Sequence, residues 1–463
     1  MKSEVQIGWP SLFLIIFLEG FISISVEILT IRQMLPFVGN SVVVTSLIIG
    51  VFLLSLAFGY YRGGLYKGHY SKILRRNFTI SAIFLGIGFS YYFLKSFFLS
   101  FAYVFTNDAI VALMSYLLLI TAPLIYLLGQ TVPITTNLFK YEHHVGVISG
   151  KVLSLSTLGS FLGSVITAAV LMNYFGVAWT VMINLFGLVG LVVALTPVSI
   201  TEFWRYVFLI FLVGFIYIFN VGFENSFFIK MNQYNSYRVA DNATLSDGQK
   251  GKVLLVNESA SSFIDQNNKG FPYIERIKDI LFKDLKLRNK DILVLGAGGF
   301  TLSAESTFGN RFVYNDIDKS IKKVTEENFH KPINGKFIAE DARKLPLYAD
   351  KIFDVIVVDV FNHRYSIPFH LLTKEHFENL RRILKEGGYI VFNVIARPTL
   401  RDRYSKRVDN TIRSVFPSCM IMPMRYNSGL QNIIYVCNVG REDQDRVVYT
   451  DNRNSATLDL YSR

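Results

Sequence analysis

Charged residues are distributed very unevenly along this chain, and that constrains the fold more than any other feature. The first 229 residues contain 18 Lys, Arg, Asp and Glu residues, about 8%, whereas the remaining 234 contain 64, about 27%. The second fraction is ordinary for a soluble domain, and the first is far too low for one. We therefore predict a multi-pass α-helical membrane domain over 1–229, a soluble domain over 230–440 and a polar, poorly ordered tail over 441–463. Neither a simple soluble enzyme nor a protein that is only a transporter fits this division.

Seven apolar stretches in the first half are long enough to cross a bilayer as helices. They lie near 10–36, 41–61, 78–105, 109–129, 146–172, 175–197 and 206–224. The loop over 62–77 is strongly basic, with Arg62, Lys67, Lys72, Arg75 and Arg76. Because basic loops stay on the cytoplasmic side, we expect this loop to be cytoplasmic.

The expected location of the soluble domain conflicts with the number of apolar stretches. With the N-terminus inside, seven crossings place that domain outside. The chemistry inferred below uses a cytosolic metabolite, so we expect a protein of the bacterial inner membrane whose soluble domain shares the cytosolic face with residues 62–77. This requires one stretch that does not cross, or one further crossing. The doubtful stretches are 78–105, with Lys95 in its middle, and 206–224. An outside domain is the alternative.

The first apolar stretch contains three ionisable residues, Glu19, Glu27 and Arg32. It lacks a small-residue cleavage site, so we interpret it as a retained membrane segment. Ionisable groups inside a span are costly and face other helices or a polar cavity, and both interpretations are open here. Gly159 and Gly163 have the spacing that permits close helix approach.

Composition narrows the partners of the soluble domain. The net charge of +12 includes no dense Lys/Arg tract, so no nucleic-acid-binding surface is expected. Cys419 and Cys437 have no metal-ligand spacing and form no disulfide framework, which fits a reduced, cytosol-facing domain. No metal site is predicted.

The second half alternates between strand and helix patterns. Strands are predicted over 252–256, 261–264, 291–295, 312–314, 336–338, 353–358, 389–394, 419–424 and 431–438. Helices are predicted over 273–285, from 301, and over 319–329, 373–384 and 401–416. The alternation indicates an α/β, doubly wound (Rossmann-like), mostly parallel sheet.

Glycines and acids follow the predicted parallel strands, where such sheets bind ligands. A glycine turn with Gly296, Gly298 and Gly299 follows the first, and Asp316, Asp341 and Asp359 follow the next three in order. Asp316 lies 20 residues after Gly296, the spacing of an acid that binds ribose hydroxyls. The dinucleotide fingerprint is incomplete, because Thr301 occupies its sixth position. The pattern predicts a nucleoside site, and the alternative is a set of helix caps and turns without a ligand.

These residues resemble the spermidine synthase (polyamine aminopropyltransferase) family, which has the class I S-adenosylmethionine-dependent methyltransferase fold. The similar segments are Asp354–Asp359, Leu372–Phe377, Leu384–Gly388 and Tyr273–Glu275. The resemblance covers roughly 235–440, and the first half resembles the multi-pass region fused to such domains in some bacterial proteins.

The resemblance implies a role for each matching residue. Gly296 and Gly298 match the glycine loop, Asp316 the acid on the ribose, and Asp341, beside Ala342, the acid on the adenine amino group. Asp359 matches the acid near the reacting amine, with Tyr273 and Glu275 on the substrate-binding helix. Three positions depart from the family. Gly299 replaces an acid that binds the aminopropyl ammonium, Ser261 lies about where a glutamine serves the same group, and Asn362 replaces an acid of the acceptor site.

The expected function is that of a membrane-integral transferase that moves an aminopropyl or other alkyl group from decarboxylated or intact S-adenosylmethionine to an amine. The departures favour the intact donor and an acceptor other than a free polyamine. The acceptor is a small-molecule amine or a membrane-resident molecule, and a homodimer is compatible with the sequence. Two alternatives remain: a methyltransferase of a membrane-associated substrate, and a transporter or sensor whose domain only binds a nucleoside.

Overall fold

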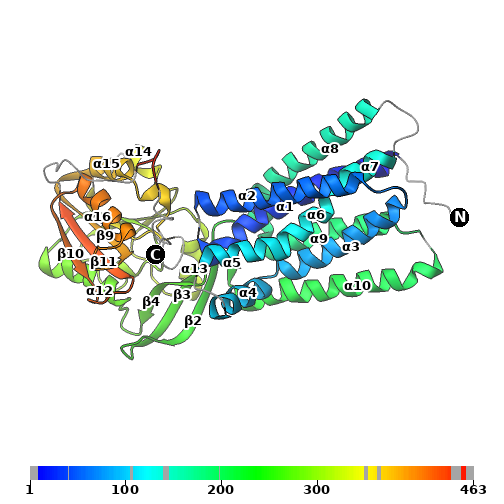
Figure 1. Cartoon of the computed structure of the whole chain (residues 1–463). Coiled ribbons are helices and arrows are strands. Elements are labelled where there is room, and N and C mark those ends of the chain that lie inside the picture. Colours follow the sequence, from blue (N-terminus) through cyan, green and yellow to red (C-terminus); the bar gives the residue numbers. More distant parts are fainter. Residues whose placement is uncertain are drawn as a thin grey trace. The chain divides into compact units, whose positions relative to one another are not determined.

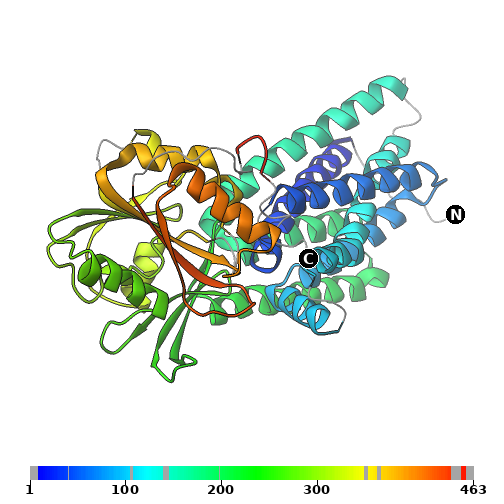
Figure 2. The same cartoon turned by 60° about the vertical axis from the view of Figure 1, so that its left-hand side comes forward.

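The chain forms two structural units, drawn from two directions in Figures 1 and 2. One comprises Met1–Val38 and Val44–Gln233, and the other comprises Gly39–Val43 and Tyr234–Arg463. This computed structural model describes residues 9–39, 41–104, 108–138, 145–197, 199–348, 353–361, 367–438 and 450–454.

The first unit is a bundle of helices. They are α1 (Trp9–Val38), α2 (Val42–Gly64), α3 (Tyr70–Gly88), α4 (Tyr91–Val104), α5 (Ala109–Tyr116), η1 (Leu117–Thr121), α6 (Ala122–Gly129), α7 (Thr131–Leu138), α8 (Val145–Ile166), η2 (Thr167–Phe175), α9 (Gly176–Ala194), η3 (Ile200–Glu202), α10 (Phe203–Tyr217), η4 (Ile218–Gly222) and α11 (Phe223–Phe227). Among the described residues, five helical stretches are long and apolar enough to cross a membrane, or six when the bent pair α3 and α4 counts as one span.

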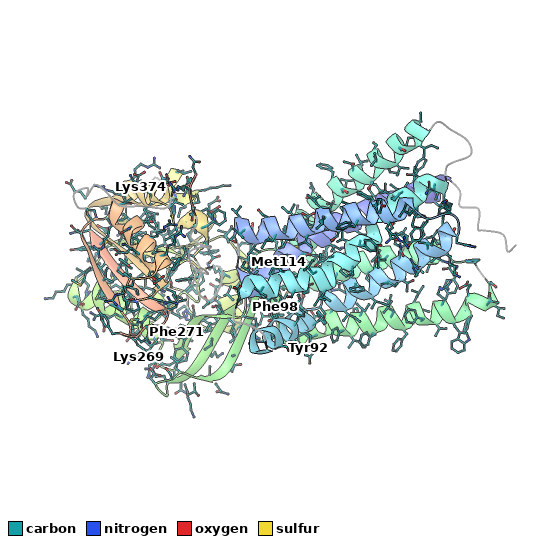
Figure 3. All side chains as sticks on the ribbon, in the orientation of Figure 1. Tyr92, Phe98, Met114, Lys269, Phe271 and Lys374 are labelled. Carbon is teal, nitrogen blue, oxygen red and sulfur yellow. A yellow bond between two sulfur atoms is a disulfide. The ribbon has the colours of Figure 1, made fainter. Side chains whose placement is uncertain are left out.

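The predicted stretch 78–105 is corrected by the structure. Its helix begins earlier, at Tyr70, and α3 and α4 meet at a bend of 70°. In α4, the Phe98 ring stacks on Phe37 of α1 at 4.6 Å, and Met114 of α5 packs against the same apolar cluster (Figure 3). The predicted stretch is therefore two helices and not one, and α4 packs beside the ends of α1 and α5.

Close packing between α1 and α8 involves the predicted glycine pair. A Cβ atom at Gly159 would overlap the carbonyl oxygen of Phe17, and one at Gly163 would overlap that of Phe21. The Glu19 carboxylate lies at the same interface, where it accepts from Ser23 at 2.9 Å. Since residue numbers rise together in both helices, α8 runs parallel to α1.

Helix α9 runs in the opposite direction. The Asn184 amide donates to the Ser25 hydroxyl at 2.8 Å, and Gly187 lies against Ile22, so numbers fall in α9 as they rise in α1. The reversal occurs at Gly176, whose φ of +82° interrupts the helix. The continuous stretch Gly146–Ala194 thus contains two helical segments that run in opposite directions. The predicted number of seven membrane spans stays a prediction.

The basic loop and the exit of the chain lie at opposite ends of this bundle. Arg75 pairs with Glu202 at 3.4 Å, at the start of α10. The Arg32 guanidinium, near the far end of α1, donates to the carbonyl oxygen of Asn232 at 2.9 Å. The expectation that the loop and the soluble domain share one face of a membrane stays a prediction.

The second unit contains a small antiparallel sheet and a larger mixed one. Strand β1 (Lys230–Met231) belongs to the first unit. The elements of the second unit are β2 (Ser236–Thr244), β3 (Lys250–Val256), β4 (Ser259–Asp265), α12 (Pro272–Asp279), η5 (Ile280–Asp284), β5 (Asp291–Leu295), η6 (Thr301–Ser303), β6 (Arg311–Asp316), α13 (Ser320–Asn328), β7 (Lys336–Ala339), α14 (Leu345–Tyr348), β8 (Phe353–Val358), η7 (Phe369–Leu371), α15 (Lys374–Ile383), β9 (Leu384–Ala396), α16 (Arg403–Val415), β10 (Cys419–Pro423) and β11 (Gln431–Asn438). The prediction missed β2 and expected a longer helix at 301.

The larger sheet has the order β10-β11-β9-β8-β5-β6-β7. Strands β9, β8, β5, β6 and β7 are parallel, and β11 pairs antiparallel with β9 and β10. Strand β5 is buried on both faces: Leu293 and Leu295 belong to one core cluster, and Ile292 and Val294 to the other. This explains its continuous apolar sequence and confirms the predicted doubly wound α/β fold.

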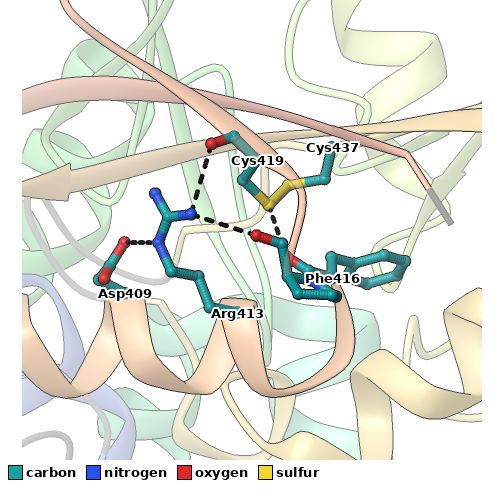
Figure 4. The surroundings of a disulfide bond; sticks show 6 residues. Asp409, Arg413, Phe416, Cys419 and Cys437 are labelled. Atoms are coloured by element: carbon teal, nitrogen blue, oxygen red, sulfur yellow. Dashed lines mark hydrogen bonds and ion pairs between the residues drawn. A yellow bond between two sulfur atoms is a disulfide. The ribbon is translucent and has the colours of Figure 1, made fainter. Parts of the chain in front are cut away.

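One expectation about the cysteines is wrong. Cys419 and Cys437 are directly opposite in the β10–β11 ladder and form a disulfide (Figure 4). Sequence spacing did not indicate this, because the pairing depends on strand register. Among the described tail residues 450–454, Asp451 pairs with Arg343. The expectation that the tail over 441–463 is poorly ordered stays a prediction.

Candidate active site

A cavity of about 720 Å³ lies at the carboxyl ends of the parallel strands in the second unit. Seven of the predicted site residues line it, namely Tyr273, Gly296, Gly298, Asp316, Asp341, Ala342 and Asp359. The structure thus brings together residues that four strand ends and helix α12 supply. A volume of this size suits a nucleoside together with a second small molecule.

The turn after β5 depends on the absence of side chains. Gly296 has φ of +87°, and a Cβ atom there would overlap the carbonyl oxygen of Asp359. Gly298 has φ of +48°, and its Cβ would lie 2.9 Å from the Ser262 hydroxyl. The turn therefore presents bare backbone to the cavity, as a close approach by a ligand requires.

Gly299 does not line the cavity. The expectation that this position discriminates between intact and decarboxylated S-adenosylmethionine therefore loses its support. The Gly299 N–H donates to the Ser262 hydroxyl at 2.7 Å, and a Cβ atom there would overlap the Phe329 ring. A carboxylate cannot be added at this position without moving the ring. Ser261 does line the cavity. Ser262, which the sequence did not single out, holds the turn in place.

Asp316 is fixed at the end of β6 by two backbone donors. Its carboxylate accepts from the Asp318 N–H at 3.0 Å and from the Ala297 N–H at 3.3 Å. Burial raises the pKa of Asp316 to about 6. A carboxylate has about four acceptor positions, so this group can also accept from two ribose hydroxyls.

Asp341 begins the turn into α14. Its carboxylate accepts from the Arg343 N–H at 2.8 Å, so the capping role that the sequence left open is real. Asp341 and Ala342 also line the cavity, which keeps the adenine-binding role available.

Replacing Asp316 with alanine is expected to weaken adenosine binding about 5- to 150-fold, because two hydroxyls lose a charged acceptor worth roughly 1–3 kcal/mol. Calorimetric titration with adenosine and 2′,3′-dideoxyadenosine measures this. Wild type should discriminate between the two ligands, and Asp316→Ala should not. Equal discrimination by both proteins would remove Asp316 from the ribose site.

Asp359, after β8, is the most closely supported side chain in the cavity. The Tyr273 hydroxyl donates to one carboxylate oxygen at 3.1 Å, and the Asn393 amide donates to the other at 2.7 Å. Asn432 in turn donates to the Asn393 amide oxygen at 2.9 Å. Burial raises the pKa of Asp359 to about 6. The sequence left Asn393 ambiguous and missed Asn432, whose position is set by the β9–β11 pairing.

One predicted substrate residue, Glu275, does not line the cavity. The Glu275 carboxylate accepts from the Gly270 N–H at 2.7 Å and pairs with Lys278 at 2.8 Å, so it braces the start of α12. Asn362 lies outside the described residues. Within the described ranges, no group of three or more His, Cys, Asp or Glu side chains could hold a metal ion.

Parts of the second unit are similar in sequence to known proteins. A family model described as a methyltransferase domain matches residues 293–392. A polyamine aminopropyltransferase of Vibrio vulnificus is 31% identical over 156 residues, which cover 32% of this chain and 49% of that protein. One from Saccharolobus islandicus is 27% identical over 200 residues, which cover 40% and 64%. The second unit is therefore similar in sequence to the polyamine aminopropyltransferases.

The chain spans about half to just under two thirds of the length of these curated relatives. Among solved structures, a probable spermidine synthase from Corynebacterium glutamicum is 24% identical, with a TM-score of 0.38, over 44% of this chain and 77% of that one.

Proposed function

We propose that this chain is a membrane-integral transferase whose second unit moves an alkyl group from an adenosyl sulfonium donor to an amine. The observation that carries the proposal is the half-buried Asp359 carboxylate, held by Tyr273 and Asn393 in a cavity that Asp316 and Asp341 also line. Homology to the polyamine aminopropyltransferases makes aminopropyl transfer from decarboxylated S-adenosylmethionine the leading form of the reaction.

The donor carries its own leaving group, so no nucleophile of the protein is needed. The amine lone pair forms a bond to the carbon next to sulfur, the carbon–sulfur bond breaks, and its electron pair leaves sulfur as a neutral thioether. One amine proton must then depart. The Asp359 carboxylate can accept that proton or stabilise the positive charge on nitrogen, while the cavity aligns the two reactants.

Methyl transfer from intact S-adenosylmethionine is the second candidate, and the glycine turn favours it. Gly299 lies off the cavity wall, and the Phe329 ring fills the space that a side chain there would need, so the wall beside the glycine turn is set by other residues. Ser261, the cavity residue beside Gly298, is neutral. Intact S-adenosylmethionine carries a carboxylate that an acid at this point would repel, so a neutral wall accommodates it.

The nucleoside product distinguishes these reactions. Purified protein is incubated with each donor and a panel of amines. Aminopropyl transfer releases methylthioadenosine, and methyl transfer releases S-adenosylhomocysteine. We expect one of these products to form only when an acceptor amine is present. Nucleoside binding without either product would contradict the proposal and support the sensor alternative.

A further inference from the structure

Basic side chains gather at one end of the helix bundle. Near the α2–α3 loop, the described residues include Arg62, Lys67, Lys72, Arg75, Arg76, Lys151 and Arg205. The opposite end has Arg32, Lys95 and Lys230. Two of these three side chains pack within the bundle. Arg32 is 7% exposed, and the Lys95 ammonium lies 4.6 Å from the centre of the Phe227 ring. The positive-inside rule therefore assigns the α2–α3 loop to the cytoplasm.

The chain leaves the bundle at the opposite end, and this exit is firmly attached. The Glu224 carboxylate accepts from the N–H of Ala178, at the start of α9, at 3.0 Å. The carbonyl oxygen of Met231 lies against Gly176, within 3.0 Å of where a Cβ would be. No candidate membrane span follows Phe227 in the described chain. The second unit is therefore connected to the bundle at the end opposite the basic loop.

The disulfide is an independent observation that agrees with this orientation. Disulfides persist in oxidising compartments and are rare in the cytosol. Cys419 and Cys437 join β10 to β11. The hairpin supplies cavity residues, including Arg425 in the connection and Asn432 in β11. The bond thus closes a hairpin that forms part of the cavity wall, where a reducing compartment would leave the two strands unlinked.

From these observations we infer that the transferase unit faces the extracytoplasmic side of the membrane. The orientation stands apart from the proposed function, but its chemical consequence rests on that function. The acceptor is then an amine outside the cytoplasm or in the outer leaflet. The adenosyl donor, which is made in the cytosol, must be supplied by a step that moves a charged nucleoside across the membrane.

Cysteine labelling in intact cells tests the orientation without reference to activity. Single cysteines replace Lys72 in the basic loop and Lys323 on α13, whose side chain is 77% exposed. The chain without an added cysteine is the background control. A membrane-impermeant maleimide should label Lys323→Cys in intact cells and Lys72→Cys only after permeabilisation. Labelling of both or of Lys72→Cys alone would overturn the inference, and both must react in detergent.

The redox state of the cysteines gives a second, independent measurement. Cells are quenched in acid, and free thiols are alkylated before and after reduction. Cys419 and Cys437 should react only after reduction. Two free thiols in freshly quenched cells would contradict an oxidising location.

Vesicles of defined orientation separate the orientation from the chemistry. S-adenosylmethionine or its decarboxylated form, added outside together with the panel of amines, should be consumed by right-side-out vesicles and not by inverted ones. Consumption only by inverted vesicles would overturn the inference. Consumption by neither, with the expected labelling, would contradict the proposed function and leave the orientation intact.

Discussion

The Asp359→Asn variant is expected to lose about 10²- to 10⁴-fold in kcat/KM for alkyl transfer, the usual contribution of a positioned proton acceptor. Asparagine has nearly the same shape and can keep one hydrogen bond each with Tyr273 and Asn393. The cavity should therefore survive, and nucleoside affinity should change little. Steady-state product formation and calorimetric titration together measure this separation.

Asp354→Asn is the matched control for this variant. It makes the same chemical change in the same strand, at the end away from the cavity, where Asp354 accepts from the Asp291 N–H at 2.9 Å and pairs with Lys385. Activity of this control should stay close to wild type. Equal losses in both variants would indicate a general effect on the sheet and would remove Asp359 from the reaction.

The pH profile carries a further signature of Asp359. Burial raises the pKa of its carboxyl to about 6, so the group is charged above that pH and protonated below it. Since only the charged form accepts a proton, kcat/KM of wild type should fall as the pH drops through about 6. A profile of Asp359→Asn that falls at the same pH would assign the titration to another group.

Gly163→Ala and Gly159→Ala are expected to destabilise the helix bundle by roughly 1–3 kcal/mol each, the usual cost of overpacking. A single methyl at either site overlaps a backbone carbonyl oxygen of α1, so the two helices must separate. Separation also disturbs the buried Glu19 at the same interface. The unfolding midpoint of the detergent-solubilised protein measures the effect.

Gly150→Ala provides the control within the same helix. No atom lies within 4 Å of a Cβ at Gly150, so the added methyl contributes only the helix propensity of alanine, about 0.5–1 kcal/mol in favour of folding. Its midpoint should equal or exceed that of wild type. A decrease as large as that of Gly163→Ala would show that the α1–α8 contact is not the cause.

The sequence by itself determined the division into two halves, the fold class and the composition of the cavity edge. Low charge over 1–229 leaves few solutions other than apolar helices, and the continuous apolar run of β5 requires burial on both faces. Gly296, Asp316, Asp341 and Asp359 could be placed together because parallel strands end at a common edge. Each of these signals is local, since it depends on residue type and period along a short segment.

Only the tertiary structure decided which groups meet. Tyr273 reaches Asp359 across 86 positions, and the closing hairpin brings Asn432 to Asn393 and Cys419 to Cys437. The ring of Phe329 decides that Gly299 has no room for an acid. The reversal at Gly176 and the attachment of Arg32 to Asn232 decide at which end the chain leaves the bundle. These contacts join residues far apart in the chain, so their geometry depends on register, helix direction and packing, which no short segment encodes.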